Sequence, residues 1–341
     1  MSGRRVWRLI VRIAVVGTGS IGRRHIGNLL RLGYDDVFAV SEKKKIKTLE
    51  VGSRTIPVVD DVDAALHSAV DTMFICNPTN LHFRYLEKAI EAGKHVFVEK
   101  PVGSMMGDFT TLRRKSEQKK LIIGVGHQFR FNPHLEELRE KVKAKFMGTI
   151  FRAEAIQGEH IADYHPDEDY RESYAAKKDL GGGVLLTQIH QIDYLNWIFG
   201  PFPRVFAVSR QPSILDIDVE ESVSYFLESH SGCPIYGHMD FLARPKTVSI
   251  QIMGDEHSMI WDYYGGKLIC SSQGNVDEKP TIAKRPFNRN QMFLDVVRDF
   301  LKAVASDEKP RSDLADGVAA LRIVEGIKES ISSGRVVEID S

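Results

Sequence analysis

A histidine and an aspartate, His190 and Asp193, follow three consecutive glycines in the stretch GGGVLLTQIHQID at residues 181–193. Residues three apart lie on one face of a helix, so the aspartate can orient the imidazole or reach a substrate hydroxyl. The ordinary pKa of histidine, about 6.5, suits proton exchange with an alcohol near neutrality. Because glycine runs are costly to order, we expect either a bulky ligand close to this main chain or a sharp turn. The alternative is a flexible loop before a core helix.

A second candidate site is the glycine pattern VVGTGSIGRRH near the start of the chain, which has the spacing of dinucleotide-binding turns. The first glycine permits a tight turn, the second lets a pyrophosphate approach the main chain, and the third lets the following helix pack closely on the sheet. The N-terminus of that helix offers amides and a partial positive charge to the phosphates. The residues expected to hold the cofactor here are Gly17, Gly19, Ser20, Ile21 and Gly22.

An acidic residue, Glu42, stands at the end of the next apolar run, VFAVS. A carboxylate in this place accepts hydrogen bonds from the ribose hydroxyls of NAD and repels the additional phosphate of NADP. Three lysines follow it at 43–45, and they either begin a solvated helix or neutralise that phosphate. We expect NAD, with NADP as the alternative.

A lysine follows the apolar run HVFV, where Lys100 stands between Glu99 and Pro101. Ligands of doubly wound sheets bind at the carboxyl ends of the strands, so a lysine in this place can meet a substrate. The alternative is a surface lysine that pairs with Glu99.

These residues must be positioned by two different kinds of sheet. From residue 11 to about 125, short apolar runs alternate with amphipathic stretches, which predicts an N-terminal Rossmann domain with a doubly wound parallel sheet over residues 1–130. Over residues 131–341, several runs with alternating polarity predict a C-terminal α+β domain with a large, mostly antiparallel open sheet. Pro133 opens a further helix, and two more are expected near 291–305 and 314–332. The fold class is α/β.

The composition excludes several classes of protein. The chain has 341 residues with 46 Lys and Arg against 46 Asp and Glu, which gives no electrostatic reason to expect nucleic acid or an anionic membrane as a partner. It has three widely spaced cysteines, which fit a reducing cytoplasm better than a disulfide framework or a zinc site. The opening MSGRRVWRLIVR resembles a basic leader, but arginines interrupt its apolar run, so we expect a short tail before the first strand.

Five segments, taken in this order, resemble the glucose–fructose oxidoreductase and inositol dehydrogenase family, also called Gfo/Idh/MocA. They are GTGSIGRRH at 17–25, CNPTNLH at 76–82, VEKPVG at 98–103, VGHQFRFNP at 125–133 and GGGVLLTQIHQIDYLNWIFG at 181–200. The resemblance implies that Lys100 and His190 are catalytic, that the C-terminal sheet forms a dimer or tetramer, and that the glycines at 181–183 leave room for a bound sugar. The further cofactor contacts that it implies are Asn77, Pro78, Thr79, His82 and Glu99.

The chain departs from the family at Thr187, where many relatives have an aspartate ahead of the histidine. A threonine can hydrogen-bond a hydroxyl but carries no charge, so proton transfer rests more heavily on His190 and Lys100. The segment 158–183 resembles a subset of the family found in pathways for surface-glycan and sialic-acid-like sugars. No metal is expected from His160, Asp163 and His165 in this segment. The expected substrate contacts are Thr187, Asp193, Arg130, Asn132, Tyr174 and Lys178.

The sequence thus predicts an NAD(P)-dependent oxidoreductase that transfers a hydride between nicotinamide and a carbinol of a sugar, sugar derivative or nucleotide sugar. In this hypothesis His190 takes the hydroxyl proton, and Lys100 hydrogen-bonds the same oxygen. Two alternatives remain open: a non-catalytic sensor or regulator that keeps the cofactor fold, and a diol or imine dehydrogenase of the same fold.

Overall fold

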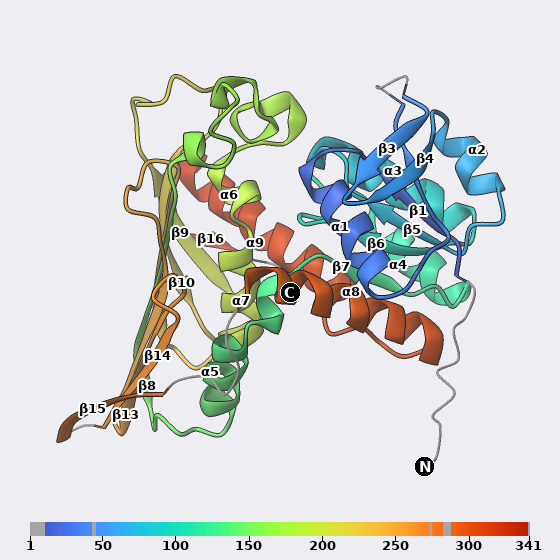
Figure 1. Ribbon diagram of the computed structural model, residues 1–341. Helices are drawn as coiled ribbons and strands as arrows, with labels where there is room; N and C mark the ends of the chain where they lie inside the picture. The colour runs from blue at the N-terminus through green and yellow to red at the C-terminus, as the bar shows by residue number, and fades with distance from the viewer. Residues whose placement is uncertain (1–10, 43–45, 273–274, 282–287, 340–341) are drawn as a thin grey trace, which may run out of the picture. The chain divides into compact units, whose positions relative to one another are not determined.

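The chain divides into two compact units in the computed structural model, which describes residues 11–42, 46–272, 275–281 and 288–339 (Figure 1). The first unit contains the chain up to Val102 together with 107–126 and 293–314, and the second contains 103–106, 127–292 and the chain from Ala315. The return of 293–314 to the first unit was not predicted. The tail with Arg4 and Arg5 and the lysines at 43–45 lie outside the described residues.

The first unit is built on a doubly wound sheet whose long apolar runs are buried because helices cover both faces. All neighbouring strands pair in parallel except β3 with β4. That hairpin was missed, although Gly52 at its turn, with φ of +60°, is the residue that such a turn favours. In spatial order the strands are β3 (Thr48–Val51), β4 (Arg54–Val59), β2 (Val37–Val40), β1 (Ile13–Val16), β5 (Thr72–Ile75), β6 (His95–Val98) and β7 (Ile123–Val125).

The returning segment belongs to the core of the first unit because its helix packs on this sheet. The ring of Phe300 lies 5.8 Å from that of Phe74 and 5.5 Å from that of Phe97. A Cβ built on Gly124 of β7 would lie 2.7 Å from the Phe300 ring, so only glycine permits this approach. The helices of this unit are α1 (Ser20–Arg31), α2 (Val62–His67), α3 (His82–Glu91), α4 (Phe109–Gln118) and, from Phe293 onward, α8 (Arg289–Ser306).

The second unit contains a large sheet that is antiparallel except for one central parallel pair, β8 with β11. Alternating burial along its strands, as in β12, shows one covered face and one open face. In spatial order its strands are β15 (Asn275–Thr281), β14 (Lys267–Ser272), β13 (His257–Asp262), β12 (Thr247–Gly254), β8 (Ile150–Gly158), β11 (Pro234–Asp240), β10 (Ser222–Glu228), β9 (Arg204–Ser209) and β16 (Val337–Glu338).

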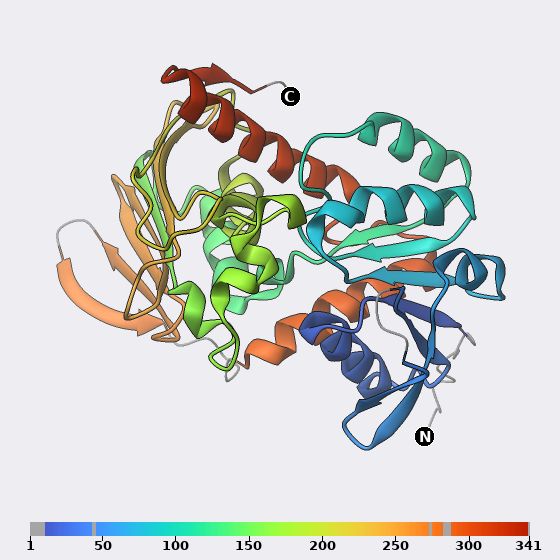
Figure 2. The same cartoon turned by 90° about the horizontal axis from the view of Figure 1, so that it is seen from above.

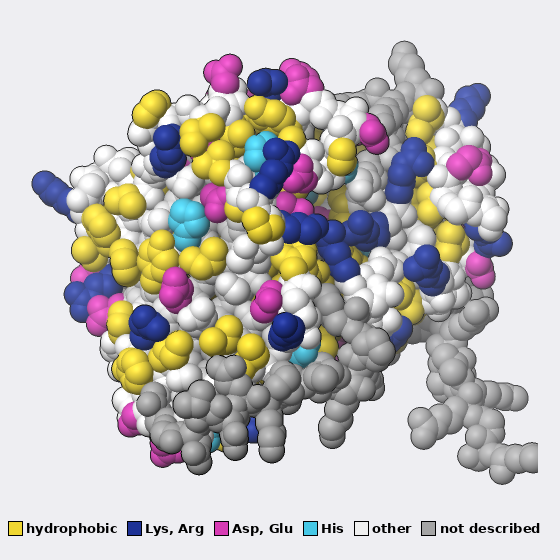
Figure 3. Space-filling view, turned by 60° about the vertical axis from the view of Figure 1, so that its left-hand side comes forward, with side chains coloured by type: hydrophobic (Ala, Val, Ile, Leu, Met, Phe, Trp, Pro, Cys, Tyr) yellow, Lys and Arg dark blue, Asp and Glu magenta, His cyan; other side chains and the backbone are white. Residues whose placement is uncertain are grey.

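Helices cover one face of this second sheet and leave the other open (Figures 1 and 2). Hydrophobic side chains gather on the open face (Figure 3), where Val208 and Phe226 are each 52% exposed. The helices are α5 (Pro133–Lys143), α6 (Val184–Thr187), α7 (His190–Phe199) and α9 (Leu314–Ser333). The predicted fold class and the predicted helices are therefore confirmed. No helix in the described part of the chain is long and apolar enough to cross a membrane.

Candidate active site

The glycine turn between β1 and α1 has the geometry that its sequence predicted. Gly17 has a φ of +108°, and a Cβ on it would lie 2.6 Å from the carbonyl oxygen of Cys76 at the end of β5. A Cβ on Gly22 would lie 2.0 Å from the carbonyl oxygen of Gly17. Both positions therefore require glycine, the first for conformation and packing and the second for packing alone.

Gly19 differs from its two neighbours because a Cβ built there would meet no atom within 4 Å. It is the N-cap residue of α1, so no side chain caps the helix, and no acidic residue stands in the first turn. The amides and the positive end of the helix therefore face open space beside a residue without a side chain. This arrangement fits the pyrophosphate of a dinucleotide.

Glu42 follows β2 as predicted, and its exposed carboxylate is bound by a neighbouring tyrosine. The hydroxyl of Tyr85 on α3 donates a hydrogen bond to it. Burial together with this carboxylate raises the pKa of Tyr85 well above its ordinary value, so the hydroxyl stays a donor. The tyrosine thus orients the group expected to bind a ribose.

The loop after β5 leads through η1 (Thr79–Leu81) into α3, which begins at His82. His82 is 1% exposed, and its ring nitrogens face two carbonyl oxygens: Nδ1 lies 2.6 Å from that of Pro101, and Nε2 lies 2.8 Å from that of Asn77. Burial lowers the pKa of His82. The polar atoms of this side chain therefore contact the main chain of two separate loops.

Lys100 lies directly after β6 and is half-buried, and its neighbour Glu99 is 6% exposed. Glu99 Oε1 accepts a hydrogen bond of 2.6 Å from His25 Nε2, and Oε2 accepts one of 3.3 Å from the Lys100 amide. Burial alone raises the pKa of Glu99, but the bond from His25 and the nearby cations outweigh it, so the pKa is lowered. In the structure, this carboxylate thus binds a buried histidine of α1.

In the second unit, His190 is the first residue of α7 and is 5% exposed. Its Nε2 lies 2.9 Å from Nε2 of Gln128, a buried residue of η2 (Gln128–Phe131). The ring of Phe129, from the same short helix, lies 5.0 Å from the imidazole at an angle of 35°. The segment 128–129 therefore fixes both the edge and one face of the candidate base.

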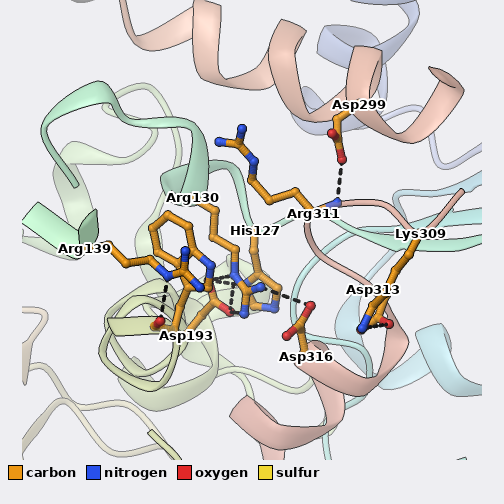
Figure 4. Close-up of polar contacts among 10 residues, drawn as sticks. His127, Arg130, Arg139, Asp193, Asp299, Lys309, Arg311, Asp313 and Asp316 are labelled. Atoms are coloured by element: carbon orange, nitrogen blue, oxygen red, sulfur yellow. Dashed lines mark hydrogen bonds and ion pairs between the residues drawn. The ribbon is translucent and has the colours of Figure 1, made fainter. Parts of the chain in front are cut away.

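Asp193 and Arg130 form a buried ion pair (Figure 4). Arg130 donates to the two carboxylate oxygens of Asp193 at 2.7–3.1 Å and also pairs with Asp316 at 3.0 Å. His127 Nδ1 lies 3.4 Å from Asp193 Oδ2. Arg130 is 2% exposed and Asp193 is fully buried, so the described contacts of these expected substrate ligands are with each other and with the protein.

Two polar residues of this network, His127 and Gln128, were not among the site residues expected from the sequence. Both follow β7 directly and precede Arg130, so the rule that strand ends carry functional groups could have found them. Asn132 lies in the same stretch, and its Oδ1 caps α5 by accepting from the amides of His134 and Leu135. It is 1% exposed.

The three glycines were expected to leave room for a sugar, but this reason for them was wrong, because the chain itself occupies the space beside Gly182 and Gly183. A Cβ on Gly182 would lie 2.5 Å from the carbonyl oxygens of Tyr174 and Ala175, and one on Gly183 would lie 2.3 Å from Glu220 Oε1. Gly181 and Gly183 also have positive φ, of +77° and +101°. The glycines are therefore required by close packing of the chain on itself, which sets the start of α6 and α7.

The loop before these glycines is held by its own polar side chains. Tyr170 donates to the carbonyl oxygen of Leu215 at 3.0 Å, and Tyr164 accepts from Gln188 at 3.1 Å. By contrast, Tyr174 is 40% exposed and Lys178 is exposed, as a ligand contact requires. Among the described residues, no group of three or more His, Cys, Asp and Glu side chains is arranged to hold a metal ion.

Thr187, the departure from the family pattern, ends α6 three residues before His190. Its hydroxyl oxygen is buried. The helix does not continue from Thr187 to His190, because Gln188 and Ile189 separate α6 from α7.

Comparisons with known proteins agree with this architecture. A doubly wound sheet with a glycine turn fitted to a dinucleotide, followed by a unit with a large sheet, defines a class of cofactor-dependent enzymes. Residues 11–127 match the family model of an oxidoreductase family with an NAD-binding Rossmann fold, and residues 154–339 match that of its C-terminal alpha/beta domain. The chain belongs to the Gfo/Idh/MocA family and is an NAD(P)-dependent oxidoreductase, which confirms the predicted enzyme class and cofactor.

Two curated relatives and one solved structure illustrate the similarity. Inositol 2-dehydrogenase 3 of Saccharopolyspora erythraea is 30% identical over 354 residues, covering 97% of this chain and 96% of that protein. The 4-carboxy-2-hydroxymuconate-6-semialdehyde dehydrogenase of a Sphingobium species is 29% identical over 319 residues, covering 92% and 96%. A levoglucosan dehydrogenase solved with NADH and levoglucosan has a TM-score of 0.85 at 18% identity, covering 97% and 100%.

Proposed function

We propose that this protein oxidises or reduces a carbinol of a sugar, sugar derivative or nucleotide sugar with NAD as its cofactor. The observation that carries the proposal is the joint presence of the open glycine turn at Gly19, Lys100 after β6 and His190 at the start of α7. Inositol 2-dehydrogenase, a relative that covers nearly the whole chain, is named for a polyhydroxylated ring as substrate.

The cofactor would be held by the amides at the start of α1, by Glu42 at the ribose and by the loop Asn77–Thr79. Bound NAD supplies the hydride acceptor. His190 takes the proton of the substrate hydroxyl as a base, and Lys100 donates a hydrogen bond to the same oxygen and stabilises its developing negative charge. Thr187 offers a hydroxyl to the substrate but no charge.

Three of the expected substrate contacts also hold the site in place. They are Arg130, Asp193 and Asn132. The ion pair of Arg130 with Asp193 fixes η2 against α7, and this holds Gln128 on His190. Asn132 fixes the start of α5, which follows η2 directly. Tyr174 and Lys178, which are exposed on the loop before the glycines, are the proposed outer contacts of the substrate.

The loop at 158–183 also suggests a finer substrate class, the surface-glycan or sialic-acid-like sugars. An exposed tyrosine can pack on a sugar ring, and an exposed lysine can bind a carboxylate or phosphate group. Tyr174 and Lys178 supply this pair of groups within one short stretch. An anionic sugar is therefore preferred to a neutral one in this proposal.

The open face of the second sheet is the proposed surface for a homo-oligomer. Phe226 on β10 lies opposite Phe206 on β9 and Tyr236 on β11, and Val208, two residues after Phe206, is also exposed. Large exposed apolar patches of this kind mark association sites. The oligomer is proposed to be a dimer or a tetramer. A cytoplasmic location is proposed because Cys76, Cys233 and Cys270 are free thiols.

The proposal is tested by following reduced nicotinamide by absorbance, with NAD and NADP each offered inositols, free sugars, uronic sugars, N-acetylated sugars and nucleotide sugars. A signal that is lost in His190→Ala and Lys100→Met, while both variants still bind NAD, supports the proposal. Wild-type turnover in Lys100→Met removes this lysine from the mechanism. Bound cofactor whose redox state no sugar changes favours the sensor alternative, and turnover of diols or imines alone favours the other dehydrogenases of the fold.

A further inference from the structure

Two buried histidines from other parts of the first unit contact the segment Glu99–Lys100–Pro101, one on each side of its lysine. His25 comes from α1, 74 residues before Glu99, and His82 comes from the start of α3, 19 residues before Pro101. The two histidines are 0% and 1% exposed. The mechanism proposed above uses neither of them.

His25 acts on the amino side of Lys100. Its Nε2 donates to Glu99 Oε1 at 2.6 Å, and the other oxygen of that carboxylate accepts from the Lys100 amide at 3.3 Å. The imidazole is enclosed by Phe74, Phe97 and Phe293, whose ring centres lie 5.2–6.3 Å away. Because the carboxylate is buried with the imidazole, loss of His25 would leave it without its strongest described donor.

His82 acts on the carboxyl side of Lys100. Its Nδ1 lies 2.6 Å from the Pro101 carbonyl oxygen, and its Nε2 lies 2.8 Å from the Asn77 carbonyl oxygen. One side chain therefore contacts both the lysine segment and the loop after β5, which is one of the segments proposed to hold the cofactor. Each ring nitrogen therefore faces a carbonyl oxygen of a different loop.

We propose that His25 and His82 are positioning residues that hold the Glu99–Lys100–Pro101 segment, and thereby Lys100, in register with the cofactor loop. This inference rests on the proposed function of Lys100. It assigns Glu99 and His82 a role different from direct contact with the cofactor. The Pro101 contact of His82 serves the chemical step, and its Asn77 contact serves cofactor binding.

The two nitrogens of His82 can be tested separately, because asparagine places an amide near the Nδ1 position and glutamine places one near the Nε2 position. His82→Asn places an amide donor opposite the Pro101 carbonyl oxygen, so we expect a raised KM for NAD with a smaller change in kcat. His82→Gln places an amide donor opposite the Asn77 carbonyl oxygen, so we expect kcat to fall about 10- to 100-fold with a smaller change in KM for NAD, since small misplacements of a reacting group cost this much. A general loss of stability would not raise mainly the KM for NAD in one variant and lower mainly kcat in the other.

The role of His25 is tested with one variant that removes the donor to Glu99 and one that keeps a donor there. His25→Leu keeps an apolar side chain among the aromatic rings but removes the donor to Glu99, so kcat is expected to fall. His25→Gln keeps a donor near Nε2 and should restore most of the rate, and it also remains informative if the leucine variant fails to fold. His95→Gln is the matched control, because His95 lies at the other end of β6, where its Nδ1 accepts from the Ile122 amide.

The outcomes separate this inference from the function on which it rests. An inactive Lys100→Met together with opposite splits in the two His82 variants supports it. An inactive Lys100→Met with wild-type kcat in His82→Gln and His25→Gln, or with identical changes in both His82 variants, overturns the positioning role and leaves the proposed function standing. Wild-type turnover in Lys100→Met overturns both.

Discussion

Gln128 Nε2 lies 2.9 Å from His190 Nε2, and both side chains are buried. An amide of this kind can donate to a neutral imidazole nitrogen or, when turned over, accept from a protonated one. Gln128 thus supplies a partner to the proposed base in both of its protonation states. The contact joins η2 to the first residue of α7, which are 62 residues apart in the chain.

Replacing Gln128 is therefore expected to impair turnover more than stability. Gln128→Leu should lower kcat by about 10- to 100-fold, less than the roughly 100- to 10,000-fold that general base catalysis contributes, because the base itself is kept, and it should change the pH profile of kcat. Steady-state kinetics between pH 5 and 9 measure both effects. Gln191→Leu is the control, because Gln191 is also buried but bonds Tyr225 and the His238 carbonyl oxygen. Equal losses of kcat in the two variants would contradict the prediction.

The Arg130–Asp193 pair predicts a large and non-additive effect on stability. Both groups are almost completely buried, so Arg130→Met or Asp193→Asn leaves a charge without its main partner and should cost about 3–5 kcal/mol each. The double variant Arg130→Met/Asp193→Asn removes both charges and should cost less than the sum of the two single variants. Chemical denaturation measures the three values. Strict additivity would show that the two groups do not interact.

The exposed pair Arg113–Glu117 on α4 is the natural comparison for this cycle. Its two side chains are 62% and 61% exposed, although their atoms lie 2.8 Å apart. Water screens such a pair, so removing either group is expected to leave the unfolding midpoint unchanged.

The glycine turn predicts that binding and folding can be separated by two similar substitutions. Gly19→Ala places a Cβ in open space, so the fold should keep its stability within about 0.5 kcal/mol, while NAD affinity should fall because the methyl group occupies the place of a phosphate. Gly22→Ala forces a Cβ against the Gly17 carbonyl oxygen and should destabilise the unit itself. Thermal unfolding and NAD titration of both variants test this. Unchanged NAD affinity in Gly19→Ala would contradict the proposed pyrophosphate site at the start of α1.

The lowered pKa of Glu99 predicts that the folded protein loses stability in acid. Because its folded-state pKa lies below the ordinary value of 4.5, its stabilisation is fully present above that value and is lost as the pH falls through the lower folded value. Glu99→Gln removes this titration. The difference in unfolding free energy between wild type and Glu99→Gln should therefore be largest near neutrality and shrink below pH 4.5. A difference that stays constant from pH 7 to pH 3 would refute the assignment.

The sequence alone determined the class of this protein, since the relevant signals are local. The run before Gly17 forms a strand because it is apolar throughout, and the glycine spacing specifies a turn whose steric needs are met within a few residues. The same holds for the alternation in β12 that predicts a sheet with one open face. These patterns were sufficient for the fold class, and the resemblance of five segments to known proteins supplied the oxidoreductase family.

Only the tertiary structure decided which polar groups meet. The partners His25 and Glu99, Gln128 and His190, and Arg130 and Asp193 are 62 to 74 residues apart. No local periodicity encodes such a pairing, because it depends on how helices far apart in the chain pack against each other and against the ends of strands. The glycines at 181–183 depend in part on a similar contact, since a Cβ built on Gly183 would lie 2.3 Å from Oε1 of Glu220, which comes from another segment of the chain.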